Sequence, residues 1–225
     1  MKKGFNLKFT ARDVVLVIIG IFVMSIGTAM SYIANIGTGS IGTVVDGVHN
    51  LLHISHGLAD ITVCIVLMVP MLFMARDLIG IGTLISTFGI GIFIDICKAV
   101  IGLIPFGDSW AVRVVLSVAG LVISSLGASI YVSTGAGISS FDALMLITYR
   151  ITGLSYSHAS IVANYTMLFV GWLLGGTVGL GTIVTILIGG YVSEFFMART
   201  WKYIGKPSPL ARENEEAPAQ EAVQQ

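Results

Sequence analysis

Residues 179–194 read GLGTIVTILIGGYVSE, a glycine-rich helix start followed by an apolar run that ends in a lone acid, Glu194. Residues 80–95 read GIGTLISTFGIGIFID and repeat that plan, ending in Asp95. In both copies the acid follows the first glycine by fifteen positions (80 to 95 and 179 to 194). The doubling predicts an internally duplicated chain with charge inside an apolar environment.

The composition of the 225 residues indicates a membrane protein. The chain is 55% hydrophobic and 11% charged, with a mean hydropathy of +0.92, whereas about a quarter of the residues in a soluble domain are charged. Continuous apolar runs are typical of membrane-spanning helices of about 20 residues. They argue against a transmembrane barrel, which has short alternating segments. We therefore expect an all-α polytopic protein whose main partner is the lipid bilayer.

Apolar runs and glycine breaks divide the chain. Two short mixed segments, 41–54 and 138–152, each follow a glycine break and are too polar for ordinary spans, so we interpret them as re-entrant or interfacial half-helices. The predicted spans cover residues 13–34, 57–75, 78–103, 110–133, 157–175 and 179–201. The predicted organisation is a cytoplasmic N-terminal segment (1–12), a first membrane repeat (13–104), a linker (105–109), a second membrane repeat (110–205) and a disordered cytoplasmic tail (206–225).

Further matches at an offset near one hundred residues support two homologous halves. Gly27 matches Gly127, and Gly37 matches Gly137. If each half crosses three times, the halves are inverted relative to each other, as in many transporters. If the half-helices also cross, eight spans form parallel repeats. Loop charges favour eight, whereas the polarity of the half-helices favours six. Our interpretation is six spans plus two half-helices, with eight as the alternative.

Basic residues flank the membrane region at both ends. They are Lys2, Lys3, Lys8 and Arg12 before the first span, and Arg199, Lys202, Lys206 and Arg212 around and after the end of the last. Under the positive-inside rule, both termini are cytoplasmic. Because these charges serve as topology signals, we predict no nucleic-acid partner.

Several short motifs in the second half resemble a known family. They are Gly137-Ile138-Ser139-Ser140-Phe141-Asp142, Thr152-Gly153-Leu154-Ser155, Gly171-Trp172-Leu173-Leu174-Gly175-Gly176 and Gly179-Leu180-Gly181-Thr182. Their order is similar to that in the YczE/YitT-type bacterial integral membrane proteins, and the likeness extends over roughly residues 20–200. The resemblance implies a multi-pass protein of the bacterial plasma (inner) membrane. The family is largely uncharacterised, so the resemblance implies no substrate.

Acids within or between spans are the main candidates for a functional site. Glu194 lies about 18 Å along its helix from Thr182, past the middle of a hydrocarbon core about 30 Å thick. Glu194 and Asp95 are predicted to contact a coupling proton, a cation or a cationic solute, or else to bond to a neighbouring helix. Asp46 and Asp142 stand near the starts of the half-helices, where an acid either caps a helix or builds a central site.

Other polar residues give weaker signals. Ser139 and Ser140 are predicted either to contact a solute or to satisfy backbone groups. His49, His53 and His56 would share a stripe with Asp46 and Asp60 on a continuous helix, a spacing that can bind a transition metal. We expect Gly57 to break that helix, so a metal site there is only a weak candidate and our prediction is no metal.

The leading hypothesis is a small transporter or permease without cofactors. Two repeats would enclose a polar midplane site for an unknown small solute or ion, built from Asp46, Asp142, Asp95, Glu194, Ser139 and Ser140. No nucleophile–base signature or HExxH motif is present, so we predict that the protein is not an enzyme. The alternative is a non-transporting scaffold or accessory protein for another enzyme system. The sequence is also compatible with a homo-oligomer.

Overall fold

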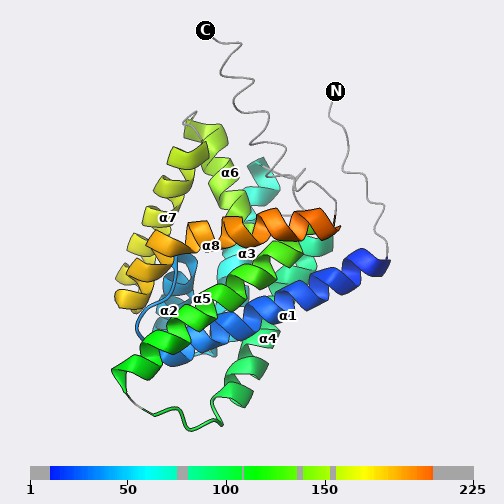
Figure 1. Ribbon diagram of the computed structural model, residues 1–225. Helices are drawn as coiled ribbons and strands as arrows, with labels where there is room; N and C mark the ends of the chain where they lie inside the picture. The colour runs from blue at the N-terminus through cyan, green and yellow to red at the C-terminus, as the bar shows by residue number, and fades with distance from the viewer. Residues whose placement is uncertain (1–10, 75–80, 108, 136–138, 153–155, 205–225) are drawn as a thin grey trace, which may run out of the picture.

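The computed structural model is described here for residues 11–74, 81–107, 109–135, 139–152 and 156–204. These residues form eight helices and no strand, which confirms the all-helical expectation (Figure 1). The predicted tail and the first ten residues lie outside the described ranges. The helices are α1 (Ala11–Ala34), α2 (Ser40–Leu52), α3 (His56–Met74), α4 (Ile81–Ile101), α5 (Trp110–Ser133), α6 (Ser140–Thr152), α7 (Tyr156–Leu173) and α8 (Leu180–Ile204).

Helices α1 and α5 pack along each other at the centre of the molecule through glycines. A Cβ built on Gly27 would stand 2.4 Å from the carbonyl oxygen of Gly120, and one built on Gly20 would stand 2.8 Å from the amide nitrogen of Tyr131. Small residues of this kind let helices approach closely in lipid, where packing rather than hydrophobicity drives association. Because the lower number on α1 meets the higher number on α5, the two helices are antiparallel.

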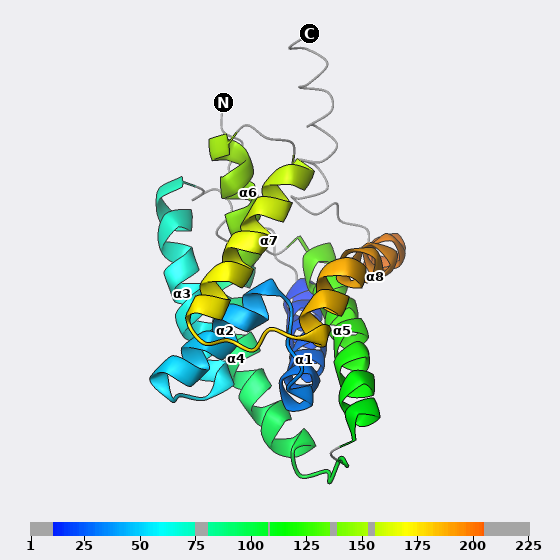
Figure 2. The same cartoon turned by 90° about the vertical axis from the view of Figure 1, so that its left-hand side faces the viewer.

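Several helices of one half pack on helices of the other half. Helices α1, α5 and α8 run side by side (Figure 1), and α4 packs on α1 and α3. The short helix α2 packs on α7 as well as on α3, while the short helix α6 packs on α3 as well as on α7. Figure 2 shows α2 lying beside α7 near the middle of the molecule. Each short helix therefore contacts the long helix that follows it and the corresponding helix of the other half.

The Gly-Leu-Gly-Thr motif at the start of α8 lies against the loop that joins α1 to α2. The amide of Gly181 donates to the carbonyl oxygen of Ile36 at 2.9 Å. Gly37 has a φ of +95°, and a Cβ there would stand 2.4 Å from Thr182 Oγ1. Glycine is thus required on the loop side both for its backbone conformation and for the close approach. The motif joins the second half to the first.

The helix containing the histidines is interrupted earlier than the sequence predicts. Helix α2 ends where His53 adopts a left-handed conformation with a φ of 54°, and α3 begins at His56. The expected break at Gly57 is therefore wrong. Gly57 lies in the first turn of α3, where its missing side chain lets α4 approach: a Cβ there would stand 2.1 Å from the carbonyl oxygen of Gly91.

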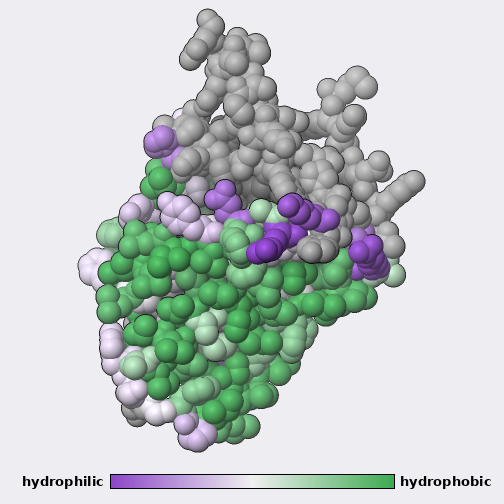
Figure 3. Space-filling view, in the orientation of Figure 1, coloured by the Kyte–Doolittle hydropathy of each residue, from purple (hydrophilic) through white to green (hydrophobic). Residues whose placement is uncertain are grey.

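The outer surface matches a membrane protein. Within the described ranges, five helices are long and apolar enough to cross a bilayer: Ala11–Ala34, His56–Met74, Gly82–Ile101, Trp110–Ser133 and Leu180–Thr200. Figure 3 shows a broad hydrophobic surface, with hydrophilic residues gathered along its upper edge. Helix α7 lies at the position of the sixth expected span but is not among these five. The choice between six and eight spans stays a prediction.

Candidate functional site: a pocket between the two halves

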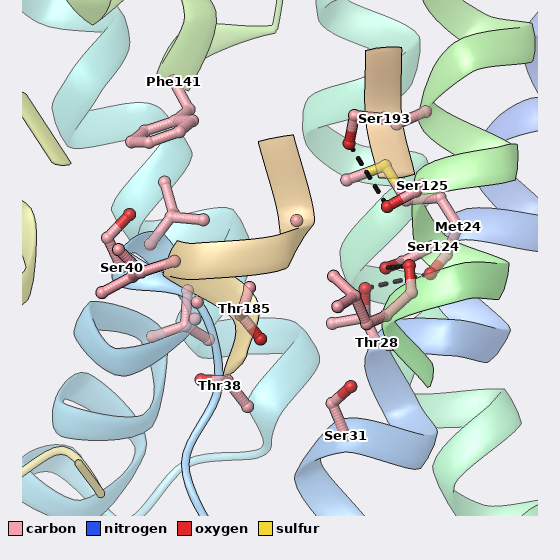
Figure 4. Close-up of a pocket in the computed structure, with 18 of the residues that line it drawn as sticks. Met24, Thr28, Ser31, Thr38, Ser40, Ser124, Ser125, Phe141, Thr185 and Ser193 are labelled. Carbon is pink, nitrogen blue, oxygen red and sulfur yellow. Dashed lines mark hydrogen bonds between the residues drawn. The ribbon is translucent and has the colours of Figure 1, made fainter. Parts of the chain in front are cut away.

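A cavity of about 450 Å³ lies between the layer of α1, α5 and α8 and the helices α2, α6 and α7. Residues from both halves line it. Its size falls in the range of about 300–1,000 Å³ that is usual for small-molecule sites. Figure 4 shows Thr28, Ser31, Ser124 and Ser125 on one side of the cavity, with Ser40 facing them across it.

The lining combines hydroxyl groups with an apolar background. The hydroxyl groups belong to Thr28, Ser31, Tyr32, Thr38, Ser40, Ser124, Ser125, Thr185 and Ser193. The larger apolar side chains are Met24, Ile41, Val45, Ile90, Ile94, Leu121, Phe141, Met145 and Ile186. The lining residues include one carboxylate, Asp60, and no Lys, Arg or His. Such a lining, mostly apolar with a few polar groups, is typical of sites that bind a small molecule.

Hydrogen bonds in the cavity wall fix its polar side chains, and one of these bonds joins the two halves. Ser40 Oγ, at the start of α2, donates to Asn164 Oδ1 of α7 at 2.5 Å. Asn164 Nδ2 in turn donates to the carbonyl oxygen of Ser160 at 2.9 Å. On the opposite wall, Ser193 Oγ of α8 donates to Ser125 Oγ of α5 at 3.3 Å. The amide and these hydroxyls are therefore held in place rather than free to rotate.

Asp46 lies outside this lining, in a polar chain beside the pocket. Asp46 Oδ2 accepts from the amide of Thr177 at 2.7 Å, and Asp46 Oδ1 lies 3.2 Å from His56 Nε2. Lys98 Nζ lies 2.8 Å from His56 Nδ1. Because an ammonium group can only donate, Nδ1 accepts and Nε2 carries the proton donated to Asp46. A neutral imidazole thus bridges a lysine and a carboxylate from two different helices.

Asp95 caps the start of α3. Asp95 Oδ1 accepts from the amide of Gly57 at 2.8 Å, and Asp95 Oδ2 accepts from Ser55 Oγ at 2.5 Å. The first amides of a helix have no partner within the helix, and an acid there also complements the helix dipole. Asp95 therefore satisfies the helix start from a neighbouring helix. Its predicted role in a solute pathway stays a prediction.

Glu194 has a different environment from its counterpart Asp95. Its side chain is exposed on α8, and it is not among the residues that line the pocket. Four residues earlier, Gly190 has no atom within 4 Å of a built Cβ, whereas the matching Gly91 touches Gly57. The two copies of the motif thus differ: α4 is docked on α3 through its glycine and acid, and α8 leaves both groups open.

The predicted residues of the second half-helix are only partly described. Ser140 is buried, and its Oγ has no hydrogen-bond partner in the described part of the chain. Ser139 is half-buried. Asp142 falls in the first turn of α6, and its side chain lies outside the described residues. Phe141, between Ser140 and Asp142, contributes to the pocket wall.

The histidines are brought together in part. The rings of His49 and His56 lie with their centroids 3.7 Å apart and their planes tilted by 37°, and His49 Nδ1 contacts the carbonyl oxygen of Ile54. His53 is exposed at the end of α2. In the ranges that the structure describes, no group of three or more His, Cys, Asp or Glu side chains is arranged to hold a metal ion.

Asp60 is the pocket residue that sequence reasoning missed. The sequence pattern places it only at the end of the histidine stripe, although an ionisable residue inside an apolar span is a functional signal in its own right. Asn164, the one amide among the lining residues, was not singled out at all. At the offset of one hundred residues, Asp60 matches Ser160 and Asn164 matches Cys64. Neither residue pairs with one of its own kind, so a search for doubled acids or amides passes over both.

The chain matches a known family over most of its length. Residues 11–198 match the family described as "Family of unknown function (DUF6198)". The chain belongs to this family. The match covers every described helix except the end of α8, so the family relation extends to both halves and to the pocket between them.

Curated relatives include two Bacillus subtilis (strain 168) proteins. The uncharacterized membrane protein YczE is 29% identical over 120 residues, which are 53% of this chain and 54% of that protein. The uncharacterized protein YyaS is 24% identical over 179 residues, which are 80% of this chain and 89% of that protein. An uncharacterized Haemophilus influenzae protein is 27% identical over 119 residues, about half of each chain. No solved structure matches significantly.

These matches confirm the resemblance to YczE-type proteins. They also confirm that the chain is a multi-pass membrane protein. The match spans about half the length of YczE, and the names of these three relatives assign no activity. Any function of the chain is therefore argued from its own pocket.

Proposed function

We propose that the protein is a small-solute permease of the bacterial plasma membrane, with the pocket between its halves as the substrate site. The observation that carries the proposal is a cavity of about 450 Å³ lined by hydroxyl groups and one carboxylate. It lies inside a bundle that exposes many large hydrophobic side chains, as on the face shown in Figure 3. Polar groups in membrane spans are costly and usually face a cavity or a pathway. A bundle with only a scaffolding role gains nothing from empty space, because a cavity forfeits packing contacts.

The arrangement of the helices supports the proposal. Helices α1 and α5 begin the two proposed repeats, and they are antiparallel at their glycine contacts. Repeats related in this way are inverted in the membrane. Inverted repeats are common in transporters, where short or broken helices place the substrate between the repeats. The pocket here is lined by residues of both short helices, Ser40 of α2 and Phe141 of α6.

The asymmetry of the two long final helices suggests which part moves. Helix α4 packs on both α1 and α3, whereas α8 packs on α5 and lines the pocket with Thr185 and Ser193. The open side of Gly190 on α8 corresponds to the packed side of Gly91 on α4. In our proposal α8 approaches α7 as α4 approaches α3, and this movement closes the pocket on one side of the membrane.

Cysteine accessibility tests whether the pocket opens to water. After replacement of Cys64 and Cys97 by alanine, single cysteines are placed by Ser125→Cys and Ser193→Cys, and Val118→Cys on the outer face of α5 is the control. A membrane-impermeant maleimide is applied to right-side-out and to inside-out vesicles. We expect both pocket cysteines to react from one side and the Val118→Cys control from neither.

Two outcomes decide between permease and scaffold. Pocket cysteines that react no faster than the control from both sides would indicate a sealed interior, and would favour the non-transporting scaffold. Reactive pocket cysteines justify flux measurements in proteoliposomes, in which filling the pocket by Ser125→Trp should abolish flux while the protein still inserts.

A further inference from the structure

The carboxylate in the pocket wall has no cationic partner within the ranges that the structure describes. Asp60 is 9% exposed and lines the cavity. In the described part of the chain it accepts only a long contact, from Cys64 Sγ to Asp60 Oδ2 at 3.9 Å. Among the described residues, no Lys, Arg or His forms an ion pair with it. A carboxylate placed in an apolar interior is costly unless a cation or several hydrogen bonds compensate. The wall of a cavity is the place where a bound ligand supplies that compensation.

Two hydroxyl groups lie near Gly42 of the short helix α2. A Cβ built on Gly42 would stand 2.5 Å from Thr38 Oγ1 and 3.6 Å from the hydroxyl oxygen of Tyr32. Both residues line the pocket. Thr38 is nine-tenths buried, and its Oγ1 has no hydrogen-bond partner in the described part of the chain. A buried hydroxyl without a partner is rare and calls for an explanation such as an absent ligand.

The rest of the wall restricts the kind of cation. A bare metal ion such as Ca²⁺ takes about six to eight oxygen ligands, whereas Asp60 shares the pocket with Met24, Ile90 and Ile94. Phe141 and Met145 add further apolar surface on α6. An ammonium group, by contrast, offers three donors and no acceptor, so one carboxylate and two hydroxyl oxygens satisfy it. Apolar side chains then surround the carbon chain attached to that group.

We propose that the pocket binds a small organic ammonium ion, with its charge on Asp60 and its N–H groups directed to Thr38 and Tyr32. The attached apolar group lies against the isoleucines and methionines of the pocket. Neutral and anionic molecules of the same shape bind worse, because they leave the carboxylate uncompensated or repel it. This inference deepens the proposed function and rests on it for its biological role, but binding at the pocket is measurable without transport.

The test measures binding to the purified full-length chain in detergent. Thermal unfolding is followed by tryptophan fluorescence during titration with n-butylammonium chloride, n-butanol, sodium butyrate, and NaCl and KCl at matched ionic strength. A ligand that binds only the folded protein raises the melting temperature according to its concentration relative to its Kd. We expect a saturable rise with n-butylammonium that exceeds the effect of every other addition.

Four variants locate the binding. Asp60→Asn should weaken binding about tenfold or more, as expected for loss of a hydrogen bond to a charged group, and Asp60→Glu should retain part of it. Thr38→Val should weaken binding about two- to tenfold with little cost in stability, because its hydroxyl has no partner to lose. Thr62→Val is the matched control. Thr62 lies on α3 outside the pocket lining, and its hydroxyl bonds within its own helix to Leu58.

Three results would overturn the ammonium site. They are equal stabilisation by n-butanol, undiminished n-butylammonium binding by folded Asp60→Asn, or a saturable Asp60-dependent shift with NaCl or KCl but none with n-butylammonium. Thr38→Val keeps the proposal testable if Asp60→Asn fails to fold. The two proposals fail in different ways. Asp60-dependent binding without flux contradicts the permease function but supports the ammonium site. Flux without Asp60-dependent binding supports the permease function but contradicts the ammonium site.

Discussion

Three polar side chains of one short helix reach across to the second half of the chain. Ser40 bonds to Asn164, Asp46 accepts from the amide of Thr177, and Asn50 Nδ2 donates to the carbonyl oxygen of Gly175 at 2.9 Å. In the core of a bilayer there is no water to form hydrogen bonds with such groups. Asp46 and Asn50 therefore satisfy backbone groups of the loop before α8, whereas Ser40 bonds to a side chain of α7. Together the three hold α2 beside α7 and that loop.

The first prediction concerns Asp95 at the start of α3. Asp95→Ala removes the acceptor for Ser55 and for the amide of Gly57, so we expect a loss of about 0.5–2 kcal/mol of stability, as for other helix caps. Asp95→Asn keeps an acceptor oxygen and should lose less. Unfolding in mixed detergent micelles with increasing SDS measures both. If Asp95→Ala is as stable as the wild type yet loses flux, Asp95 belongs to the solute pathway instead.

The second prediction concerns the chain from Lys98 through His56 to Asp46. Removing the lysine by Lys98→Met leaves the acid in a site that is only 13% exposed, and we expect a loss of roughly 1–3 kcal/mol from the hydrogen bonds to charged groups. Asp46→Asn alone should also destabilise. Because His56 links the two charges, the double variant should lose less than the sum of the single losses. Strictly additive losses in the same SDS titration would show that His56 does not couple them.

At the level of elements, glycine sets how close the long helices come. Gly27 and Gly120 bring the backbones of α1 and α5 into contact, and Gly57 and Gly91 do the same for α3 and α4. Because lipid offers apolar surface as good as any helix, such contacts depend on shape rather than on hydrophobicity. The exposed apolar faces of the same helices remain for the bilayer.

The third prediction is a matched pair of glycine substitutions. Gly27→Ala places a methyl group 2.4 Å from a backbone oxygen, so α1 and α5 must separate, and we expect a loss of about 1–3 kcal/mol, as for other overpacked sites. Gly190→Ala meets no atom within 4 Å and should leave stability unchanged or slightly raised. Both are read from the melting temperature of the purified protein. Equal effects of the two variants would contradict the close contact.

The sequence predicted the elements better than the site, for a physical reason. Apolar runs and glycine breaks are local signals, and the two half-helices begin within two residues of their expected positions. The pocket depends on which helices meet, and that is a long-range property. Asp60 therefore looked like one more polar residue on a stripe, and Lys98 was not connected to His56, which precedes it by 42 residues.

At the scale of the whole molecule, the orientation of the halves is the main question that sequence left open. Charge in the loops favoured eight spans, and polarity of the half-helices favoured six. The glycine contacts place α1 and α5 antiparallel. If these helices are equivalent members of a repeat, the first half crosses the membrane an odd number of times, as in the arrangement with six spans.

The fourth prediction tests this orientation at the loop between α4 and α5. Gly107 lies in that loop with no atom within 4 Å of a built Cβ, so Gly107→Cys should not disturb the fold. In the background without Cys64 and Cys97, we expect an impermeant maleimide to label it on intact cells with a permeable outer envelope. Fluorescent-protein fusions to either terminus should both fluoresce in the cytoplasm. Labelling only in inside-out vesicles would support eight spans.

The contacts of Asp46 also set the order of events during synthesis. Asp46 and the amide of Thr177 that it accepts from are 131 residues apart. At about 5–20 residues translated per second, Thr177 is synthesised roughly 7–26 seconds after Asp46. During that time α2 is a short polar helix with unsatisfied groups beside a bilayer. A newly made first half therefore presents this carboxylate oxygen without its later partner until the second repeat is synthesised.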